Sequence, residues 1–571
     1  MNILTKIGIQ LHTIHWVMTW KRHNNHYPSP VPENPKFMTA WQAVGLIQDG
    51  AVVGTSGIGG NQRCSLLYWA MRDRYHAEGR PKGLTVVCVG GQGGRGKVPG
   101  TLEELAVEGL QTCLIAGHIE TYKAQMKLAD AGKMELQCLP QGTLALLLQA
   151  QGEGIYSIIN ETGAGTFIDP RTGRGTPVSP VDARQYVEAL EDGRLRYTLP
   201  PIDTAVFSAP AADRKGNIYA RNSAVICESL ELVRAARRNG GKVIVNVGLM
   251  VEEGYDEIFI PAEEVDAVVY WPDVEQTATI KHRRYWDCFT LNSKTSEAEG
   301  LARQKVINDF LGITPKRKPA DAVLARLATR IFVDLARKGD HVDIGVGLPE
   351  EVSRLLHESG VMDELVMINE SGVFGGVAAP GIFFGAAINP MEIVSSAEAF
   401  QRVYRRLDWA ILGALQIDAA GNVNVSKRGE GAINYVGPGG FLDLVAKAKS
   451  LLFCSAWGDG AQYELGNGAI RITNPGKPKF IPAVDEITFN GVEALKQGKT
   501  VVYVTHVGAF RLTTRGMELI WVMPGIDVQR DILDACPMRI VLPEDGAPRI
   551  VSENIMTGRD FRLRLKSAGE D

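Results

Sequence analysis

The chain has no apolar run long enough to cross a bilayer. Each of its hydrophobic stretches is interrupted by charge or glycine well before the ~18 residues that a membrane-spanning helix needs. It also lacks a surplus of basic charge, because 61 Lys and Arg residues stand against 65 Asp and Glu residues, for a formal net charge of -4. Proteins that bind nucleic acid usually show a basic surplus or stripe. These absences predict a soluble, cytoplasmic protein whose partners include neither a membrane nor a nucleic acid.

Paired cysteines are missing as well. The eight cysteines are scattered without the spacing of a metal knuckle or a disulfide framework, which favours a reducing compartment. Residues 1–37 contain four histidines but no acidic residue before Glu33, so we predict no metal site there or elsewhere. No small-residue cleavage site follows their apolar segment. We interpret residues 1–37 as a loosely attached extension and not as a secretory signal.

Two parts of the chain resemble each other. Four segments recur in the same order: residues 46–50 as 335–339, 202–218 as 407–423, 231–236 as 443–448, and 259–262 as 480–483. Each part alternates strand-like and helix-like segments. We therefore expect an α/β protein with two tandem homologous open domains on largely parallel sheets. The first half is residues 38–298, the linker 299–325 and the second half 326–571, with a binding cleft expected between the halves.

One glycine-rich stretch invites comparison with a phosphate-binding loop. Residues 91–97 match the pattern G-x-x-x-x-G-K. The match is incomplete, because Val98 stands where a Ser or Thr hydroxyl would bind magnesium, and Pro99 delays the next helix. A nucleotide-hydrolysing site is therefore not predicted.

Glu370 is the first candidate site residue. It follows the short apolar run of residues 366–368 and is itself followed by glycines, a pattern typical of a strand that ends in a turn. Ligands of α/β proteins are met at such strand ends, so we expect Glu370 to be presented rather than buried. The alternative is an ordinary polar residue leading a strand into a loop. The first half has Gly90 and Gly91 at the corresponding place, so one active site per chain is expected.

The surroundings of Glu370 favour a nucleophile over a general acid or base. Acid–base chemistry would usually show a histidine or a second carboxylate nearby in a motif, and none accompanies Glu370 locally. A carboxylate nucleophile needs backbone donors that hold the oxyanion formed on attack. Residues 437–441, with three glycines before a predicted helix at Leu442, could supply them, or could be a plain turn.

Four motifs together carry a resemblance to a known family. They are Glu370-Ser-Gly, Gly-Val-Gly-Leu-Pro at 345–349, Pro-Gln-Gly-Thr at 140–143, and Gly-Pro-Gly-Gly at 437–440. On these motifs the chain, from Met38 to about Phe561, resembles the fused single-chain type of family I coenzyme A transferases, which act on acetate, propionate or 3-oxo acids. The resemblance implies a short-chain acyl-CoA and a small carboxylic acid as partners. It also implies no permanently bound cofactor, coenzyme A as substrate and covalent intermediate, and a homodimer or homotetramer.

The resemblance further implies roles for individual residues. The Glu370 carboxylate would attack the acyl-CoA, and coenzyme A would then form a glutamyl thioester before it passes to the incoming acid in a ping-pong exchange. Positions that would form the oxyanion hole or bind coenzyme A are Gly439, Gly440, Gln141, Gly142, Asn424, Gly345 and Gly347.

Two positions depart from the family pattern in the expected acyl pocket, which comprises Gly59, Gly60, Asn61 and Asp343. The family usually carries Asn where this chain has Asp343, and Phe where it has Asn61. If Asp343 approaches Glu370, its negative charge should raise the pKa of the glutamate and weaken it as a nucleophile. The alternatives are an acyl-CoA thioesterase on the same fold and a non-catalytic CoA-binding regulatory protein.

Overall fold

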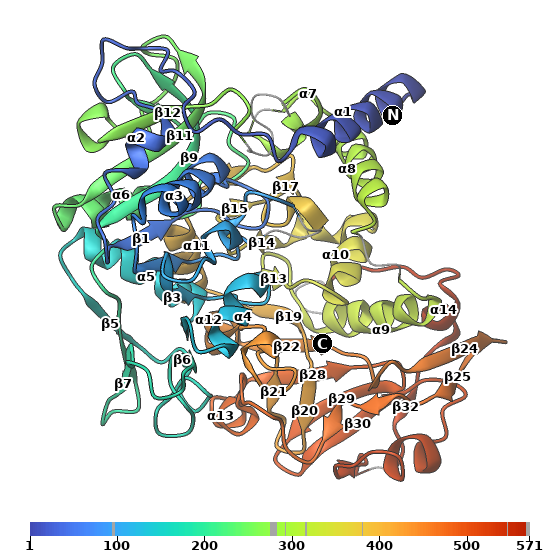
Figure 1. The fold of residues 1–571 in the computed structure, drawn as a ribbon. Coiled ribbons are helices and arrows are strands. Elements are labelled where there is room, and N and C mark those ends of the chain that lie inside the picture. The colour runs from blue at the N-terminus through green and yellow to red at the C-terminus, as the bar shows by residue number, and fades with distance from the viewer. Residues whose placement is uncertain are drawn as a thin grey trace.

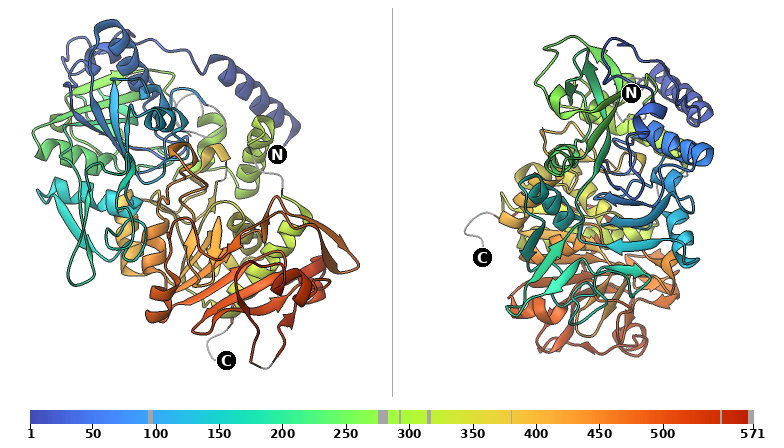
Figure 2. Two further views of the ribbon diagram at one scale, coloured as in Figure 1. Left: turned by 60° about the horizontal axis from the view of Figure 1, so that its bottom comes forward. Right: turned by 60° about the vertical axis from the view of Figure 1, so that its left-hand side comes forward.

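The two halves of the chain fold into two large sheets that lie one above the other (Figures 1 and 2). This computed structural model describes residues 1–93, 98–274, 283–291, 293–313, 317–379, 381–544 and 546–566. Both sheets are mostly parallel and carry helices on their faces, which confirms the predicted α/β class with two tandem domains. One hydrophobic cluster extends from Val31 to Leu565 through both halves, so the two sheets share a continuous core.

The first-half sheet has the order β12-β11-β9-β1-β2-β3-β4-β6, with β10 beside β9. All neighbours pair in parallel except β4 with β6 and β9 with β10. Parallel strands covered on both faces are expected to be apolar throughout, and every residue of β9 is buried. The strands are β1 (Val52–Thr55), β2 (Leu84–Cys88), β3 (Gln111–Ala116), β4 (Glu135–Cys138), β6 (Pro177–Ser179), β9 (Thr204–Asp213), β10 (Ile218–Tyr219), β11 (Lys242–Val251) and β12 (Ala267–Tyr270).

The second-half sheet has the order β14-β13-β19-β22-β28-β29-β30-β31, with β32 beside β30. It is parallel from β14 to β28 and then continues through an antiparallel meander, β28-β29-β30. Strand β14 ends this order, so it forms an edge of the sheet. The strands are β13 (His341–Ile344), β14 (Val366–Ile368), β19 (Trp409–Gly413), β22 (Ser450–Cys454), β28 (Thr500–Val504), β29 (Gly508–Thr513), β30 (Gly516–Val522), β31 (Ile540–Val541) and β32 (Arg549–Ile550).

Short strands form small sheets around the two large ones. They are β5 (Ser157–Asn160), β7 (Val187–Ala189), β8 (Leu195–Thr198), β15 (Val373–Phe374), β16 (Val377–Ala378), β17 (Ala387–Ile388), β18 (Glu392–Ile393), β20 (Gln416–Asp418), β21 (Val423–Asn424), β23 (Gly458–Asp459), β24 (Gln462–Gly466), β25 (Ala469–Asn474), β26 (Lys477–Pro478) and β27 (Phe480–Ile481).

Helix α5 of the first half brings the halves together, because it contacts both α11 and α12 of the second half and packs on α6 of its own half. The α-helices are α1 (Ile3–Thr19), α2 (Ala40–Val44), α3 (Ser65–Glu78), α4 (Lys123–Asp130), α5 (Gln141–Gly152), α6 (Ser229–Arg238), α7 (Arg283–Trp286), α8 (Glu297–Leu311), α9 (Pro319–Leu335), α10 (Pro349–Glu358), α11 (Ser396–Arg405), α12 (Phe441–Lys447), α13 (Gly491–Lys496) and α14 (Glu553–Thr557). None of the described helices is both long and apolar enough to span a bilayer.

The N-terminal extension is packed, so the expected loose attachment is wrong. Helix α1 buries Ile9 and Trp16, and Phe37 forms a parallel bridge with Val268 beside the first sheet. Two apolar side chains of the predicted segment, Ile9 and Trp16, therefore hold the helix on the body of the protein. The predicted linker 299–325 also differs from a plain connection, because helices α8 and α9 occupy most of it.

Candidate active site

Glu370 lies two residues beyond β14, at the carboxyl end of this edge strand. The apolar run predicted the strand, and the turn after it is fixed locally: the Asn369 side-chain oxygen accepts the Ser371 N–H at 3.1 Å. Gly372 follows in the left-handed conformation, with a φ of 89°. Glu370 itself is half-buried, and not simply presented to solvent as expected. The sequence therefore predicted its place correctly but underestimated its burial.

The backbone of Gly440 lies directly against the Glu370 carboxylate. A Cβ atom placed on Gly440 would lie 2.0 Å from Glu370 Oε2, so any side chain there would displace the carboxylate. The Gly440 N–H faces that carboxylate and acts to lower its pKa. The preceding Gly439 has a φ of 59°, which favours glycine, and it turns the chain into helix α12. The two predicted glycines thus deliver a backbone donor to the predicted nucleophile.

The start of helix α5 in the first half completes this arrangement. The Gln141 N–H donates to the Gly439 carbonyl at 3.1 Å, and a Cβ on Gly439 would lie 3.5 Å from the Gln141 side-chain oxygen. Gln141 and Gly142 are the first two residues of this helix. The structure therefore brings Gln141, Gly142, Gly439 and Gly440 together with Glu370 at the contact between the two halves.

Asp443 is a site residue that the sequence analysis missed. It is fully buried, and its carboxylate accepts hydrogen bonds from the Gly142 N–H at 2.8 Å, the Thr143 N–H at 3.1 Å and the Tyr404 hydroxyl at 2.8 Å. A carboxylate from the second half thus caps the N-terminus of α5 from the first half. The sequence signal that points to Asp443 is the repeat, which aligns it with Glu231.

Burial and Asp443 together set the charge state of Glu370. Burial, and then the negative charge of Asp443, raise the pKa of Glu370 to about 7, while the Gly440 N–H acts in the opposite direction. Burial also raises the pKa of Asp443, to about 6, against the hydrogen bonds that stabilise its charged form. Asp443 therefore ionises first, and Glu370 exchanges its proton near neutral pH.

The sequence predicts that Asp343 raises the pKa of Glu370, whereas in the structure Glu370 raises the pKa of Asp343. Asp343 pairs with Ile368 across β13 and β14, so it does lie beside the strand that carries Glu370. It is almost fully buried, and burial followed by the charge of Glu370 raises the pKa of Asp343 well above its usual range. The charge of Asp343 is not among the causes that raise the pKa of Glu370.

The other predicted pocket residues reach Glu370 only through a loop. Asn61 donates a side-chain N–H to the Phe384 carbonyl at 2.8 Å, and Gly59 approaches the same carbonyl so closely that a Cβ would lie 2.8 Å from it. Gly60 lies between these two residues. The next residue of the loop, Gly385, accepts a hydrogen bond from the Ser371 hydroxyl. The first-half turn thus supports the neighbour of Glu370 and not Glu370 itself.

The remaining predicted residues, Gly345, Gly347 and Asn424, lie outside this group of contacts. Gly345 follows β13 and donates its N–H to the Ile411 carbonyl at 2.9 Å, and Gly347 has a φ of 92° with open space where a side chain would be. Asn424 is fully buried, and its amide bonds Gln416 and Lys427 within its own turn. The two glycines therefore lie at the strand end next to β14, while the Asn424 side chain bonds residues of its own hairpin.

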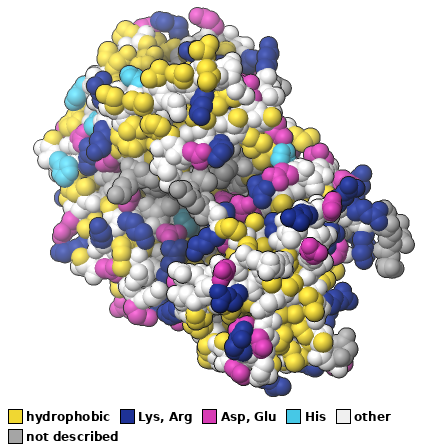
Figure 3. Space-filling model, turned by 90° about the vertical axis from the view of Figure 1, so that its right-hand side faces the viewer, with side chains coloured by type: hydrophobic (Ala, Val, Ile, Leu, Met, Phe, Trp, Pro, Cys, Tyr) yellow, Lys and Arg dark blue, Asp and Glu magenta, His cyan; other side chains and the backbone are white. Residues whose placement is uncertain are grey.

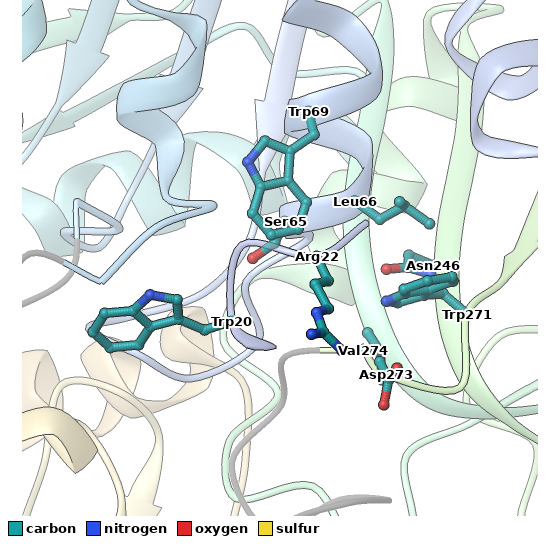
Figure 4. Close-up of a pocket in the computed structure, with 9 residues that line it drawn as sticks. All are labelled: Trp20, Arg22, Ser65, Leu66, Trp69, Asn246, Trp271, Asp273 and Val274. Carbon is teal, nitrogen blue, oxygen red and sulfur yellow. The ribbon is translucent and has the colours of Figure 1, made fainter. Parts of the chain in front are cut away.

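A small cavity lies elsewhere, between the N-terminal extension and the first half (Figure 4). Its volume of about 10 Å³ corresponds to a single water molecule. The buried polar atoms Ser65 Oγ and Asn246 Oδ1 line it and have no partner among the described residues. Within the same residues, no three His, Cys, Asp or Glu side chains lie together as metal ligands would. Neither observation adds to the site around Glu370.

Comparisons with known proteins identify the family. A family model described as Coenzyme A transferase matches residues 37–270. Caffeate CoA-transferase of Acetobacterium woodii is 32% identical over 512 residues, covering 87% of this chain and 93% of that protein. Acetate CoA-transferase YdiF of Escherichia coli K12 is 30% identical over 508 residues, covering 87% and 91%.

The solved structures agree with the sequence relatives. The acyl-CoA transferase YdiF of Escherichia coli O157:H7, in its thioester complex with CoA, matches with a TM-score of 0.79 at 27% identity and covers 95% of this chain and all of that one. The resemblance carried by the four motifs is therefore confirmed. The shared fold and the match over 87% of the chain to relatives of 30% and 32% identity show that this chain is an enzyme of the coenzyme A transferase family.

Proposed function

We propose that the protein moves coenzyme A from a short-chain acyl-CoA to a small free carboxylic acid, with Glu370 as covalent nucleophile. The observation that supports this most directly is the Glu370 carboxylate held against the Gly440 N–H where the two halves meet. The solved relative in a thioester complex with CoA supports a covalent route. Its proposed partners are acyl-CoA and carboxylic acid, with coenzyme A as substrate and covalent intermediate.

The proposed reaction has two mirror-image stages. The Glu370 carboxylate attacks the thioester carbonyl, the C–S bond breaks, and a mixed anhydride and the CoA thiolate result. The thiolate then attacks the glutamyl carbonyl of the anhydride, which releases the first carboxylate and leaves a glutamyl-CoA thioester. The incoming carboxylate reverses both steps and leaves with coenzyme A. One thioester replaces another, so no ATP is consumed.

The surroundings of Glu370 fit the requirements of both stages. Attack needs the ionised carboxylate, and its pKa of about 7 makes a substantial ionised fraction available at neutral pH. The Gly440 N–H, already directed at the carboxylate, is placed to stabilise the oxyanion that forms when the glutamyl carbonyl is attacked. Partial burial limits competition from water, which would turn the transfer into hydrolysis.

The proposed substrate class is the short-chain carboxylic acids, and the proposed assembly is a homodimer or homotetramer. An acetate CoA-transferase covered over 91% of its length supports a small acid. The relative that acts on caffeate shows that the same family accommodates a larger acid. Asn61, which occupies a position beside the loop that supports Ser371, is a proposed contributor to acid selection.

A trapping experiment tests the proposal. The enzyme is incubated with acetyl-CoA, treated with hydroxylamine or borohydride, and digested for mass spectrometry. We expect a hydroxamate or a reduced side chain on Glu370 alone, and none in Glu370→Gln. An unmodified Glu370 under turnover conditions would contradict the proposal.

An exchange assay across a panel of acids distinguishes the alternatives. Transfer requires free acid as acceptor, whereas release of free coenzyme A at the same rate without any acceptor would identify a thioesterase. Binding of acetyl-CoA with no turnover on any acid of the panel would identify a non-catalytic protein.

A further inference from the structure

Helix α1 is apolar on two opposite faces, and one of them is already packed. Ile9 and Trp16 are buried in a cluster that includes Ile307 of α8. Gly8 permits close approach to α7, because a Cβ there would lie 2.8 Å from the Tyr285 hydroxyl. The helix is therefore held on the body of the protein, and its second face points away from α8.

The second face of α1 is an exposed apolar stripe. Its members are Leu4, Ile7, Leu11, Ile14 and Met18, which are 77%, 47%, 61%, 41% and 75% exposed. Their spacing alternates between three and four residues, which is the spacing of a helix that packs along a second helix. A helix that is apolar on all sides is normally covered. Hydrophobic side chains also gather on the upper part of the side of the molecule from which α1 projects (Figure 3).

The size of this stripe is that of an interface. Together with Met1 and Ile3, which are 45% and 73% exposed, it presents roughly 700 Å² of surface, against the ~800 Å² per partner of a standard-size interface. Large contiguous apolar patches are uncommon on monomeric proteins. The stripe is therefore large enough to hold a protein partner.

The few charged side chains of α1 indicate which kind of partner its apolar stripe fits. Apart from its histidines, its one ionisable side chain is Lys6, and it has no acidic residue. A helix that lies on a membrane needs a cationic polar face, and the side of α1 opposite the stripe is occupied by α8 instead. A charged partner would find no complementary charge. An apolar stripe with alternating spacing is complementary to its own copy in the antiparallel direction.

We propose that α1 pairs with α1 of a second copy of this chain, antiparallel and stripe to stripe, with Leu11 near the two-fold axis. The contact is made by a segment that precedes the family match at residues 37–270. It is a contact of this chain's own extension, and it does not depend on the proposed chemistry at Glu370.

Sedimentation velocity of the full-length protein tests the pairing. Leu11→Lys places like charges against each other at the two-fold axis, so we expect the assembly mass to fall by half with an unchanged thermal transition. Ile550→Lys, at a side chain 70% exposed on β32, is the matched control and should leave the mass unchanged. A wild-type monomer at 10–50 µM, or a Leu11→Lys variant of undiminished mass, would overturn the proposal.

A charge-complementation experiment separates self-pairing from other causes of association. Leu11→Glu should also halve the mass, and mixing it with Leu11→Lys should restore the full mass. If the mixture stays dissociated, Leu11 does not meet its own copy and the proposal is wrong. Flotation of the wild type, but not of Leu11→Lys, with vesicles of phosphatidylcholine and phosphatidylglycerol would identify the stripe as a membrane face and would equally overturn it.

Discussion

The two halves contact each other through two equivalent helix junctions, and only one of them carries the candidate nucleophile. In the first junction, the Gln141 N–H at the start of α5 donates to the Gly439 carbonyl at 3.1 Å. In the second, the Ser396 N–H at the start of α11 donates to the Cys227 carbonyl, also at 3.1 Å. The repeat aligns Cys227 with Gly439, so the duplication has preserved the same backbone contact in both places.

The junctions differ at the next residue. The first has Gly440, which leaves room for the Glu370 carboxylate, and the second has Glu228 at the aligned position. Glu228 is buried, and burial raises its pKa to about 8, so its carboxyl is mostly protonated at neutral pH. The second junction is thus filled by a neutral side chain of its own. The scaffold is shared by both junctions, while a glycine in one of them leaves room for the candidate nucleophile.

The largest expected effect comes from removing the carboxylate that distinguishes the first junction. Glu370→Gln keeps the size of the side chain but cannot form an anhydride, so CoA exchange should fall by about 10⁴-fold or more. Initial rates with acetyl-CoA and propionate measure the loss, and acetyl-CoA binding should persist. Retention of more than a tenth of the activity would show that the asymmetry between the junctions has no catalytic meaning.

The glycine at the first junction can be tested in the same way. Gly440→Ala places a methyl group 2.0 Å from Glu370 Oε2, so the carboxylate must move away from its backbone donor. We expect kcat to fall by about 10²-fold with little change in the melting temperature, because the atom displaced is the end of a flexible side chain. Gly466→Ala is the matched control, since a Cβ there meets nothing within 4 Å. Equal activity of the two variants would contradict the role of Gly440.

The aligned carboxylates Asp443 and Glu231 offer a direct comparison of the two junctions. The charge of Asp443 helps to raise the pKa of Glu370, so Asp443→Asn should lower that pKa. Because the reaction needs ionised Glu370, the acid limb of the kcat/KM profile should move to lower pH, while kcat at pH 8 falls roughly tenfold as α5 loses its charged cap.

Glu231→Gln is the control for this pH shift. Glu231 is buried in the second junction, where it meets Ser395, and burial raises its pKa. It does not contribute to the pKa of Glu370. Its replacement should therefore leave the acid limb in place. The assignment of the pH shift to Asp443 would be wrong if Asp443→Asn and Glu231→Gln moved the acid limb equally, or if neither moved it.

Much of the site could be predicted because its parts are local motifs. The strand before Glu370, the glycines before α12 and the start of α5 each leave a pattern in consecutive residues. The repeat then indicated two similar sheets, and the structure has them. Where a short stretch fixes its own conformation, the sequence was sufficient.

The features that were missed depend on contacts between distant residues. Asp443 acts on α5 across 301 positions of the chain, and its carboxylate looks in the sequence like any acidic residue in the first turn of a helix. The packing of α1 on α8 likewise requires knowledge of where α8 lies. Burial is the common cause, since periodicity indicates which face of an element is apolar but not how many partners cover it.

The smallest effect is expected at Asp343, the residue whose charge seemed to threaten the nucleophile. Its pKa is raised well above the usual range by burial and by Glu370, which favours the protonated form. Asp343→Asn replaces one neutral side chain by another of the same shape, and both kcat/KM and its acid limb should change by less than about threefold. If Asp343 were instead ionised, the substitution would shift the acid limb to lower pH as Asp443→Asn does. A pH profile of the two variants side by side therefore decides which of the two carboxyls near Glu370 carries the charge.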